Sequence, residues 1–158
     1  MLTTLVTLLN LLDSIDLLNT GIIEWGSPVP TFGDLNKAIV ATVGLNPSNR
    51  EFLNERGNEL TGRNRRFHTL RSLRIKSWSD IDSRHIDLIT ASCFQYFQNN
   101  PYNRWFSVLE KVISGTGATY YSNLPTACHL DLIPFANKKK WAELSSPQQS
   151  TLLKITGD

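Results

Sequence analysis

A short apolar run that ends in a tight turn places the strongest constraint on the fold. Residues 38–43 are all small or β-branched, and Gly44 ends the run. A continuous run of this length is typical of a strand buried on both faces, as in a parallel sheet. The next residues, Leu45-Asn46-Pro47-Ser48, are rich in turn formers. Open parallel sheets bind ligands at the carboxyl ends of their strands, so we expect any active site at this turn.

The rest of the chain supplies one more strand and several helices. Residues 128–133 are expected to form a second buried parallel strand, which Pro134 closes. Between the strands we expect one helix that starts near Ser79 with a capping-box pattern, and another over Arg104–Ser114. Ser146-Pro147 opens a last helix. This order predicts the α/β class: a three-layer α/β/α domain with a short parallel sheet over residues 37–158.

Residues 1–36 are expected to form an amphipathic helix followed by an extended connection. Apolar residues recur at helical spacing, namely Leu2, Leu5, Leu9, Leu12 and Ile15. The helix is expected to dock on the core, and the alternative is a helix that binds a partner chain. Because Asp13 and Asp16 interrupt the apolar run and no Lys or Arg precedes it, we expect neither a membrane span nor a signal peptide. The expected location is cytoplasmic.

Positive charge is concentrated in one stretch. The whole chain of 158 residues carries a net charge of only +2, whereas residues 50–76 hold eight Arg or Lys against three Glu, a net +5. The planar fork of Arg binds phosphate oxygens in pairs, so this stretch suits a nucleic acid, and the alternative is a solvated helix surface. A second basic run, residues 138–140, is interpreted as solvated rather than as a phosphate contact.

Other classes of site are not indicated. Cys93 and Cys128 are interpreted as buried, reduced thiols rather than as a disulfide or metal site, and we expect no cofactor. No Gly-x-Gly-x-x-Gly or phosphate-loop pattern follows the first strand, which argues against a Rossmann-type nucleotide enzyme.

The turn Gly44–Ser48, with the sequence GLNPS, resembles the first motif of the uracil-DNA glycosylase superfamily. The resemblance implies that Asn46 holds the hydrolytic water, with Leu45 and Ser48 at the base pocket. It also implies that an aromatic residue after this turn stacks on the extruded base, a place that Phe67 fits. The alternative for Phe67 is an ordinary core position.

The second strand strengthens the resemblance. Residues 129–136, HLDLIPFA, are similar to the superfamily motif in which an amide side chain reads the base edge, and Asp131 occupies that position. An ionised Asp only accepts hydrogen bonds, so it would meet O4 of uracil with repulsion, which disfavours uracil as the substrate. The alternative is that Asp131 hydrogen-bonds to the Asn46 loop. From the local excess of positive charge in residues 50–76, we expect Arg50, Arg63, Arg65 and Arg66 to contact phosphates.

Two further segments, residues 101–106 and 140–145, also resemble segments of bacterial-type members of the superfamily. We assign them no catalytic role and expect Trp105 and Phe106 to pack beneath the sheet. The second catalytic loop of the superfamily is not found, and His68, His85 and His129 are judged poorly placed to replace it. The expectation is therefore a diverged member that lacks the C-terminal third of the fold.

The leading hypothesis is a DNA glycosylase that hydrolyses the N-glycosidic bond of a flipped-out damaged base without a metal. Because the second loop is not found, we expect the enzyme to be slow or inactive. Two alternatives remain open. One is a non-catalytic module that binds nucleic acid or nucleotides, and the other is a protein-interaction domain that offers an open sheet edge to a partner or to a second copy.

Overall fold

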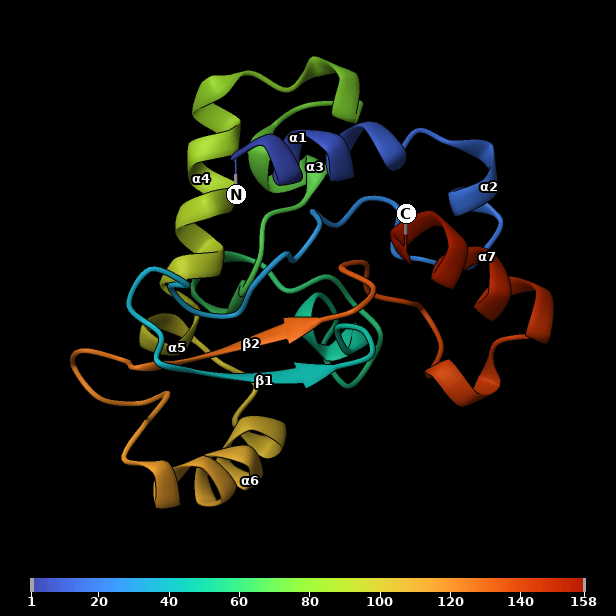
Figure 1. The fold of residues 1–158 in the computed structure, drawn as a ribbon. Coiled ribbons are helices and arrows are strands. Elements are labelled where there is room, and N and C mark those ends of the chain that lie inside the picture. The colour runs from blue at the N-terminus through green and yellow to red at the C-terminus, as the bar shows by residue number, and fades with distance from the viewer. Residues whose placement is uncertain (1, 158) are drawn as a thin grey trace.

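The computed structural model describes residues 2–157 as a mixed helix and strand architecture around a small parallel sheet (Figure 1). Strand β1 (Val40–Gly44) pairs with β2 (Ala127–Asp131) in a register that places Gly44 opposite Asp131. Phe32 forms an antiparallel bridge with His129 on the other side of β2. The predicted pairing of two parallel strands is confirmed, and the architecture is compatible with the α/β class.

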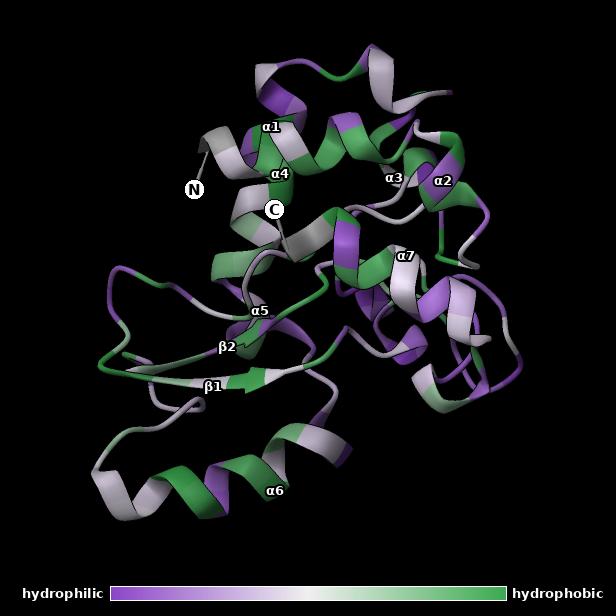
Figure 2. Ribbon diagram, turned by 45° about the vertical axis from the view of Figure 1, so that its right-hand side comes forward, coloured by the Kyte–Doolittle hydropathy of each residue, from purple (hydrophilic) through white to green (hydrophobic). Residues whose placement is uncertain are grey.

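Helices lie on both sides of this sheet. In both ribbon views α6 (Asn103–Ile113) lies on one side, and α1 (Leu2–Leu11) and α4 (Ser83–Phe94) lie on the other (Figures 1 and 2). The other helices are α2 (Ile15–Leu18), α3 (Leu70–Leu73), α5 (Tyr96–Asn99) and α7 (Ser146–Gly157). Short 3-10 turns occur at Asn49–Glu51, Gly62–Asn64, Trp78–Asp80, Ser114–Thr116 and Trp141–Glu143.

Strand β1 is less buried than its sequence predicts. Its burial alternates along the strand, and Val43 is 75% exposed, as is 73% of Ile39 just before it. Within residues 2–157, β2 is the only strand that pairs with β1, so the outer edge of β1 is open. The prediction of a strand buried on both faces is therefore wrong for β1. It describes the first part of β2 better, where Ala127, Cys128 and His129 are buried.

The predicted start of α4 near Ser79 is also wrong, because the residue that caps the helix is Asp82. Ser77 caps the 3-10 turn at Trp78–Asp80, and Asp82 caps α4 by accepting a hydrogen bond from the backbone N–H of His85 at 2.9 Å. Ser79 lies inside the 3-10 turn and caps neither element. Because both Ser77 and Asp82 satisfy free backbone N–H groups, two short capped elements replace the single start predicted.

The predicted helix over 104–114 is present as α6, but it buries a different face. Phe106 and Ile113 enter the core, whereas Trp105, Val108 and Val112 are exposed. Of the two residues expected to pack beneath the sheet, Phe106 is buried, whereas Trp105 is largely exposed. Figure 2 shows the apolar residues along this helix.

The core has two parts. An aromatic cluster surrounds Phe32 and includes Phe67, Tyr96, Phe106 and Tyr120. A second cluster joins α1 to the rest of the chain through the buried side chains of Leu5, Leu9, Leu12, Ile133 and Leu152. The predicted docking of the N-terminal helix on the core is thus confirmed, although Ile15 is exposed.

Two further features bear on the chemistry available. Cys93 and Cys128 are free, buried thiols, and burial raises the pKa of Cys93 to about 12. Among residues 2–157, no helix combines the length and the apolar character needed to cross a membrane.

Candidate functional site

A pocket of about 310 Å³ lies at the carboxyl ends of β1 and β2. One part of its lining is the turn after β1, residues 44–48, together with Glu51. His129 and Asp131 contribute from β2. Aromatic rings complete the lining, and these are Phe32, Tyr102, Trp105, Phe106 and Trp141. The pocket lining therefore combines polar side chains with aromatic rings, the composition typical of a small-molecule site.

The turn after β1 is held against the end of β2. The backbone N–H of Leu132 donates to the carbonyl of Gly44 at 3.1 Å, and that of Ile133 donates to Leu45 at 2.9 Å. Nδ2 of Asn46 donates to Oδ1 of Asn137 at 3.0 Å, which orients the amide. Oδ1 of Asn46 has no hydrogen bond to any residue in the described range 2–157, so this acceptor is available to a water or a ligand.

Asp131 is part of a buried chain of polar side chains. Its Oδ1 lies 3.2 Å from Nε2 of His129, and both side chains are almost fully buried. Nδ1 of His129 lies 2.7 Å from Oγ1 of Thr42, which lies 2.5 Å from the hydroxyl of Tyr120. The two β2 residues share a face of the strand because they are two positions apart. Asp131 thus contacts His129 rather than the Asn46 loop that the alternative interpretation named.

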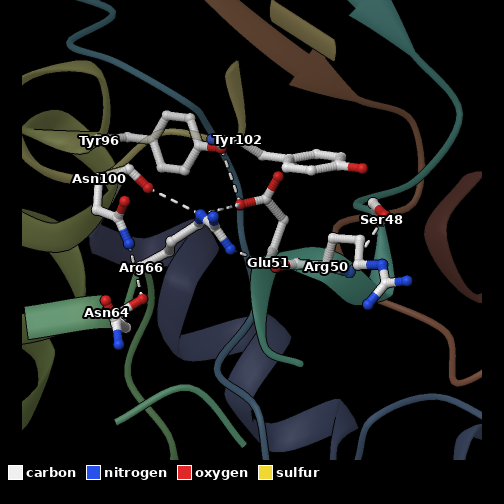
Figure 3. A network of polar contacts seen from close by, with 8 residues as sticks. All are labelled: Ser48, Arg50, Glu51, Asn64, Arg66, Tyr96, Asn100 and Tyr102. Carbon is white, nitrogen blue, oxygen red and sulfur yellow. Dashed lines mark hydrogen bonds and ion pairs between the residues drawn. The ribbon is translucent and has the colours of Figure 1, made fainter. Parts of the chain in front are cut away.

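Glu51 is a buried carboxyl in the same pocket. Tyr96 donates its hydroxyl hydrogen to Oε2 at 2.8 Å, and Nε of Arg66 lies 4.0 Å from the same oxygen (Figure 3). The pKa of Glu51 is raised to about 8, mainly by burial and to a smaller extent by the charge of Asp131, while the hydrogen bond from Tyr96 and the charge of Arg66 act to lower it. In Figure 3 the second carboxyl oxygen points away from Arg66 and toward Tyr102.

Two of the four arginines assigned to phosphate are engaged with the protein itself. Arg66 donates through Nε to the carbonyl of Asn100 at 2.8 Å and through Nη1 to that of Arg50 at 2.6 Å. Its guanidinium also lies 5.5 Å from the centroid of the Tyr102 ring. Arg50 donates through Nη1 to the carbonyl of Asn54 at 2.6 Å. These donors hold loops together, so the expectation that they contact phosphate is not supported by their geometry.

The other two arginines lie away from the pocket. Arg63 and Arg65 line a separate hollow together with His68 and residues of α4 and α5. Neither contributes to the lining of the pocket at the ends of β1 and β2.

The predicted stacking residue Phe67 lies in the core. Its ring is stacked on Tyr96, with a centroid separation of 5.1 Å and an interplanar angle of 8°, and the residue is only 1% exposed. The segment is held inside because the carbonyl of His68 accepts a hydrogen bond from the backbone N–H of Ser27 at 2.9 Å. The expectation that Phe67 faces a base is therefore wrong for this structure, and the alternative core position is the one observed.

Of the residues expected at the base, the structure brings together Leu45, Asn46, Ser48 and Asp131. The sequence interpretation missed the aromatic sides of the pocket. Trp105, expected beneath the sheet, is 54% exposed and lines the pocket. The available signal was the three aromatic residues in 101–106 and Trp141 in 140–145, two segments that resembled related ones but received no role.

His129 and two lysines are further residues that the sequence interpretation set aside. His129 lines the pocket beside Asp131, although it had been judged poorly placed. Lys139 and Lys140 line a small hollow that shares Asn46, Ser48 and Trp141 with the main pocket. Lys138 instead pairs with Glu24 at 2.7 Å. The cations that border the pocket thus come from the second basic run, which had been interpreted as solvated.

Within the described part of the chain, no group of three or more His, Cys, Asp or Glu side chains is arranged to hold a metal ion. Comparisons with protein-family models, with curated proteins and with solved structures found no match. The case for a function therefore depends on the side chains that line the pocket.

Proposed function

We propose that the chain hydrolyses the N-glycosidic bond between a sugar and an extruded nucleobase of DNA. The observation that carries the proposal is the meeting of Asn46 and Asp131, from the ends of two paired strands, in one aromatic-sided pocket. A flat heterocycle needs both features, because aromatic rings stack on its faces while polar groups read its edge.

Each pocket residue would have a separate role in such a reaction. Oδ1 of Asn46 would accept a hydrogen bond from the attacking water, and the exposed ring of Trp105 would stack on the base. The second oxygen of Asp131, which has no hydrogen bond within residues 2–157, would accept one from the base edge. Lys139 and Lys140, at the adjoining hollow, would contact the phosphates of the strand.

The direct test is release of free base from duplex and single-stranded oligonucleotides that contain uracil, hypoxanthine, xanthine or unmodified bases. We expect Asn46→Ala to slow release by about 100- to 1000-fold, because one preorganised polar group at the reacting centre is lost. Asn58→Ala is the matched control, since Asn58 is exposed and outside the pocket. Release at the wild-type rate by Asn46→Ala would contradict the assignment of the water to Asn46. Binding of DNA without any base release would favour the non-catalytic module instead.

A second candidate function is protein interaction, and the exposed apolar side chains of β1 and α6 favour it. Val43 and Val112 are each more than 70% exposed, and the outer edge of β1 has no partner strand within residues 2–157. Exposed apolar strand edges pair readily with other chains. The test is the dependence of the molar mass in solution on protein concentration. Association that Val43→Lys abolishes would support this function, and a constant monomer mass would exclude association with a second copy.

A further inference from the structure

The position of Glu51 gives this carboxyl direct access to a ligand in the pocket. The 3-10 turn at Asn49–Glu51 follows the Asn46 turn, and Ser48 caps it by accepting a hydrogen bond from the backbone N–H of Arg50 at 3.2 Å. This short turn carries Glu51 to the pocket lining, five residues after Asn46. The two side chains therefore approach one bound molecule from neighbouring positions.

The contacts of Glu51 keep its carboxyl neutral. The side chain is 3% exposed, and its closest polar partner is the neutral hydroxyl of Tyr96, at 2.8 Å. The nearby cation, Arg66, stays 4.0 Å away because its donors are directed to the carbonyls of Asn100 and Arg50. A buried carboxyl without a close ion pair retains its proton, in agreement with a pKa of about 8.

The hydrogen bonds also determine which oxygen carries that proton. The hydroxyl of Tyr96 donates its single hydrogen to Oε2 of Glu51 at 2.8 Å and accepts from the backbone N–H of Tyr102 at 2.8 Å. Oε2 is thus an acceptor, and the proton of the acid lies on Oε1. This is the oxygen that points toward Tyr102, one of the residues that line the pocket (Figure 3).

We infer that Glu51 is the general acid that protonates the departing base. This inference rests on the proposed function and adds a catalytic residue to it, since no role was assigned to Glu51 from the sequence. Enzymes that use two carboxyl groups in one site commonly give them different environments, one retaining a proton and the other accepting hydrogen bonds. Here Glu51 is the donor, and Asp131, bonded to His129, is the acceptor.

The step balances without a cofactor. The proton of Glu51 passes to an acceptor atom of the base, and the electron pair of the C1′–N bond leaves with the base. The oxygen of the water at Asn46 forms a bond to C1′ and loses one proton, which returns to the Glu51 carboxylate through solvent. The products are a free base and an abasic sugar. General acid catalysis of this kind contributes about 100- to 10,000-fold to a rate.

The experiment compares Glu51→Gln with the wild type on two substrates that differ in leaving-group ability, uracil and 5-fluorouracil in the same oligonucleotide. Gln keeps the size of the side chain and can still accept from Tyr96, but it cannot transfer a proton. We expect a loss of about 100-fold or more on uracil, and a clearly smaller loss on 5-fluorouracil, because its anion departs without protonation more easily. The wild-type rate is expected to fall as the pH rises through about 8, where Glu51 loses its proton. This fall is expected to be absent in Glu51→Gln.

Each outcome decides between the two proposals. Equal losses on both substrates, or no loss, would overturn the role of Glu51 while the proposed function stands. Release of none of the bases in the panel used to test the proposed function, under conditions in which the wild type binds the oligonucleotide, would overturn the proposed function and the role of Glu51 with it. Thermal unfolding of Glu51→Gln, together with its oligonucleotide affinity, establishes that the variant is folded. If it is not, Tyr96→Phe, which removes the hydroxyl that orients the carboxyl, is expected to reproduce the substrate-dependent loss in weaker form.

Discussion

Gly44 and Asp131 lie opposite each other in the pairing of β1 and β2, and the Asp131 carboxyl occupies the space that a side chain on Gly44 would need. A Cβ atom at position 44 would overlap Oδ1 of Asp131 and lie 2.8 Å from Nε2 of His129. Both neighbours are buried parts of the polar chain, so neither can move without breaking a hydrogen bond. The glycine at the end of β1 is therefore required by the site and not only by the turn.

Gly44→Ala is expected to displace the Asp131 carboxyl and weaken base binding by about tenfold or more, because a buried polar contact is lost. The measurement is the affinity for a base-containing oligonucleotide, with the free energy of unfolding determined in parallel. Gly115→Ala is the control, since a Cβ atom there meets nothing within 4 Å. Unchanged affinity in Gly44→Ala would show that the position of Asp131 does not matter for binding.

The stability of the protein is expected to fall as the pH rises from 6.5 to 8. The pKa of Glu51 is raised to about 8 in the folded protein, above the ordinary value of 4.5, so the folded state holds a proton that the unfolded state has lost. Stability from this group is complete below pH 4.5 and is lost as the pH rises through 8. Burial lowers the pKa of His68 to about 4, and its contribution changes only below about pH 6.5.

Urea unfolding between pH 6.5 and 8 measures this effect. The free energy of unfolding is expected to fall by roughly 1 to 2 kcal/mol over the interval in the wild type and to stay nearly constant in Glu51→Gln. Glu55→Gln, at an exposed position, is expected to behave like the wild type. The same slope in wild type and Glu51→Gln would mean that Glu51 is already ionised at pH 6.5.

We expect Trp105 to stack on the base, the role that the sequence indicated for Phe67. We expect Phe67 to stabilise the core, the role that the sequence indicated for Trp105. Trp105→Ala should reduce the free energy of base binding by about 1–3 kcal/mol, the usual worth of one stacked ring, with little change in stability. Phe67→Ala should instead destabilise the fold by about 3–5 kcal/mol, because it leaves a cavity between Tyr96 and Phe32. Chemical denaturation and oligonucleotide binding, measured on both variants, distinguish the two effects. Normal binding by Trp105→Ala would exclude this ring as the stacking surface.

The lysines that border the pocket are expected to dominate nucleic-acid binding. Replacing Lys139 and Lys140 by Ala should reduce the slope of log K against log salt by about 1.8, since each phosphate contact contributes about 0.9. The matched control replaces Arg63 and Arg65 by Ala, two cations that line a different hollow. A larger loss in the arginine variant would place the nucleic acid along that hollow and would contradict the proposed path past the pocket.

The sequence allowed the parallel pairing and the convergence of Asn46 and Asp131 to be predicted, because both depend on local patterns. A short apolar run, a Gly-x-Asn-Pro turn and a second run before a proline identify two strand ends on one edge of a sheet. The exposure of Val43 could not be predicted in this way. The residues of a strand do not reveal how many other strands pair with it.

The aromatic and acidic residues of the pocket were harder to predict for a related reason. Phe67 and Trp105 are both aromatic residues in polar surroundings, and only the packing of distant segments decides which one is buried. Glu51 is one acid within an arginine-rich stretch, and its environment depends on Tyr96, which is 45 residues away in sequence. Side chains whose character depends on such contacts carry no local signature.

The series of hydrogen-bonded side chains Tyr120, Thr42, His129 and Asp131 determines where each of their hydrogens lies. When Asp131 is ionised it can only accept, so Nε2 of His129 must donate to it, and Nδ1 is left as an acceptor. Thr42 has a single hydrogen, which it then gives to Nδ1, and the phenol of Tyr120 must donate to Thr42. All the donors point the same way, so in the neutral imidazole Asp131 selects the tautomer of His129, and the phenol of Tyr120 in the aromatic core is thereby fixed as a donor.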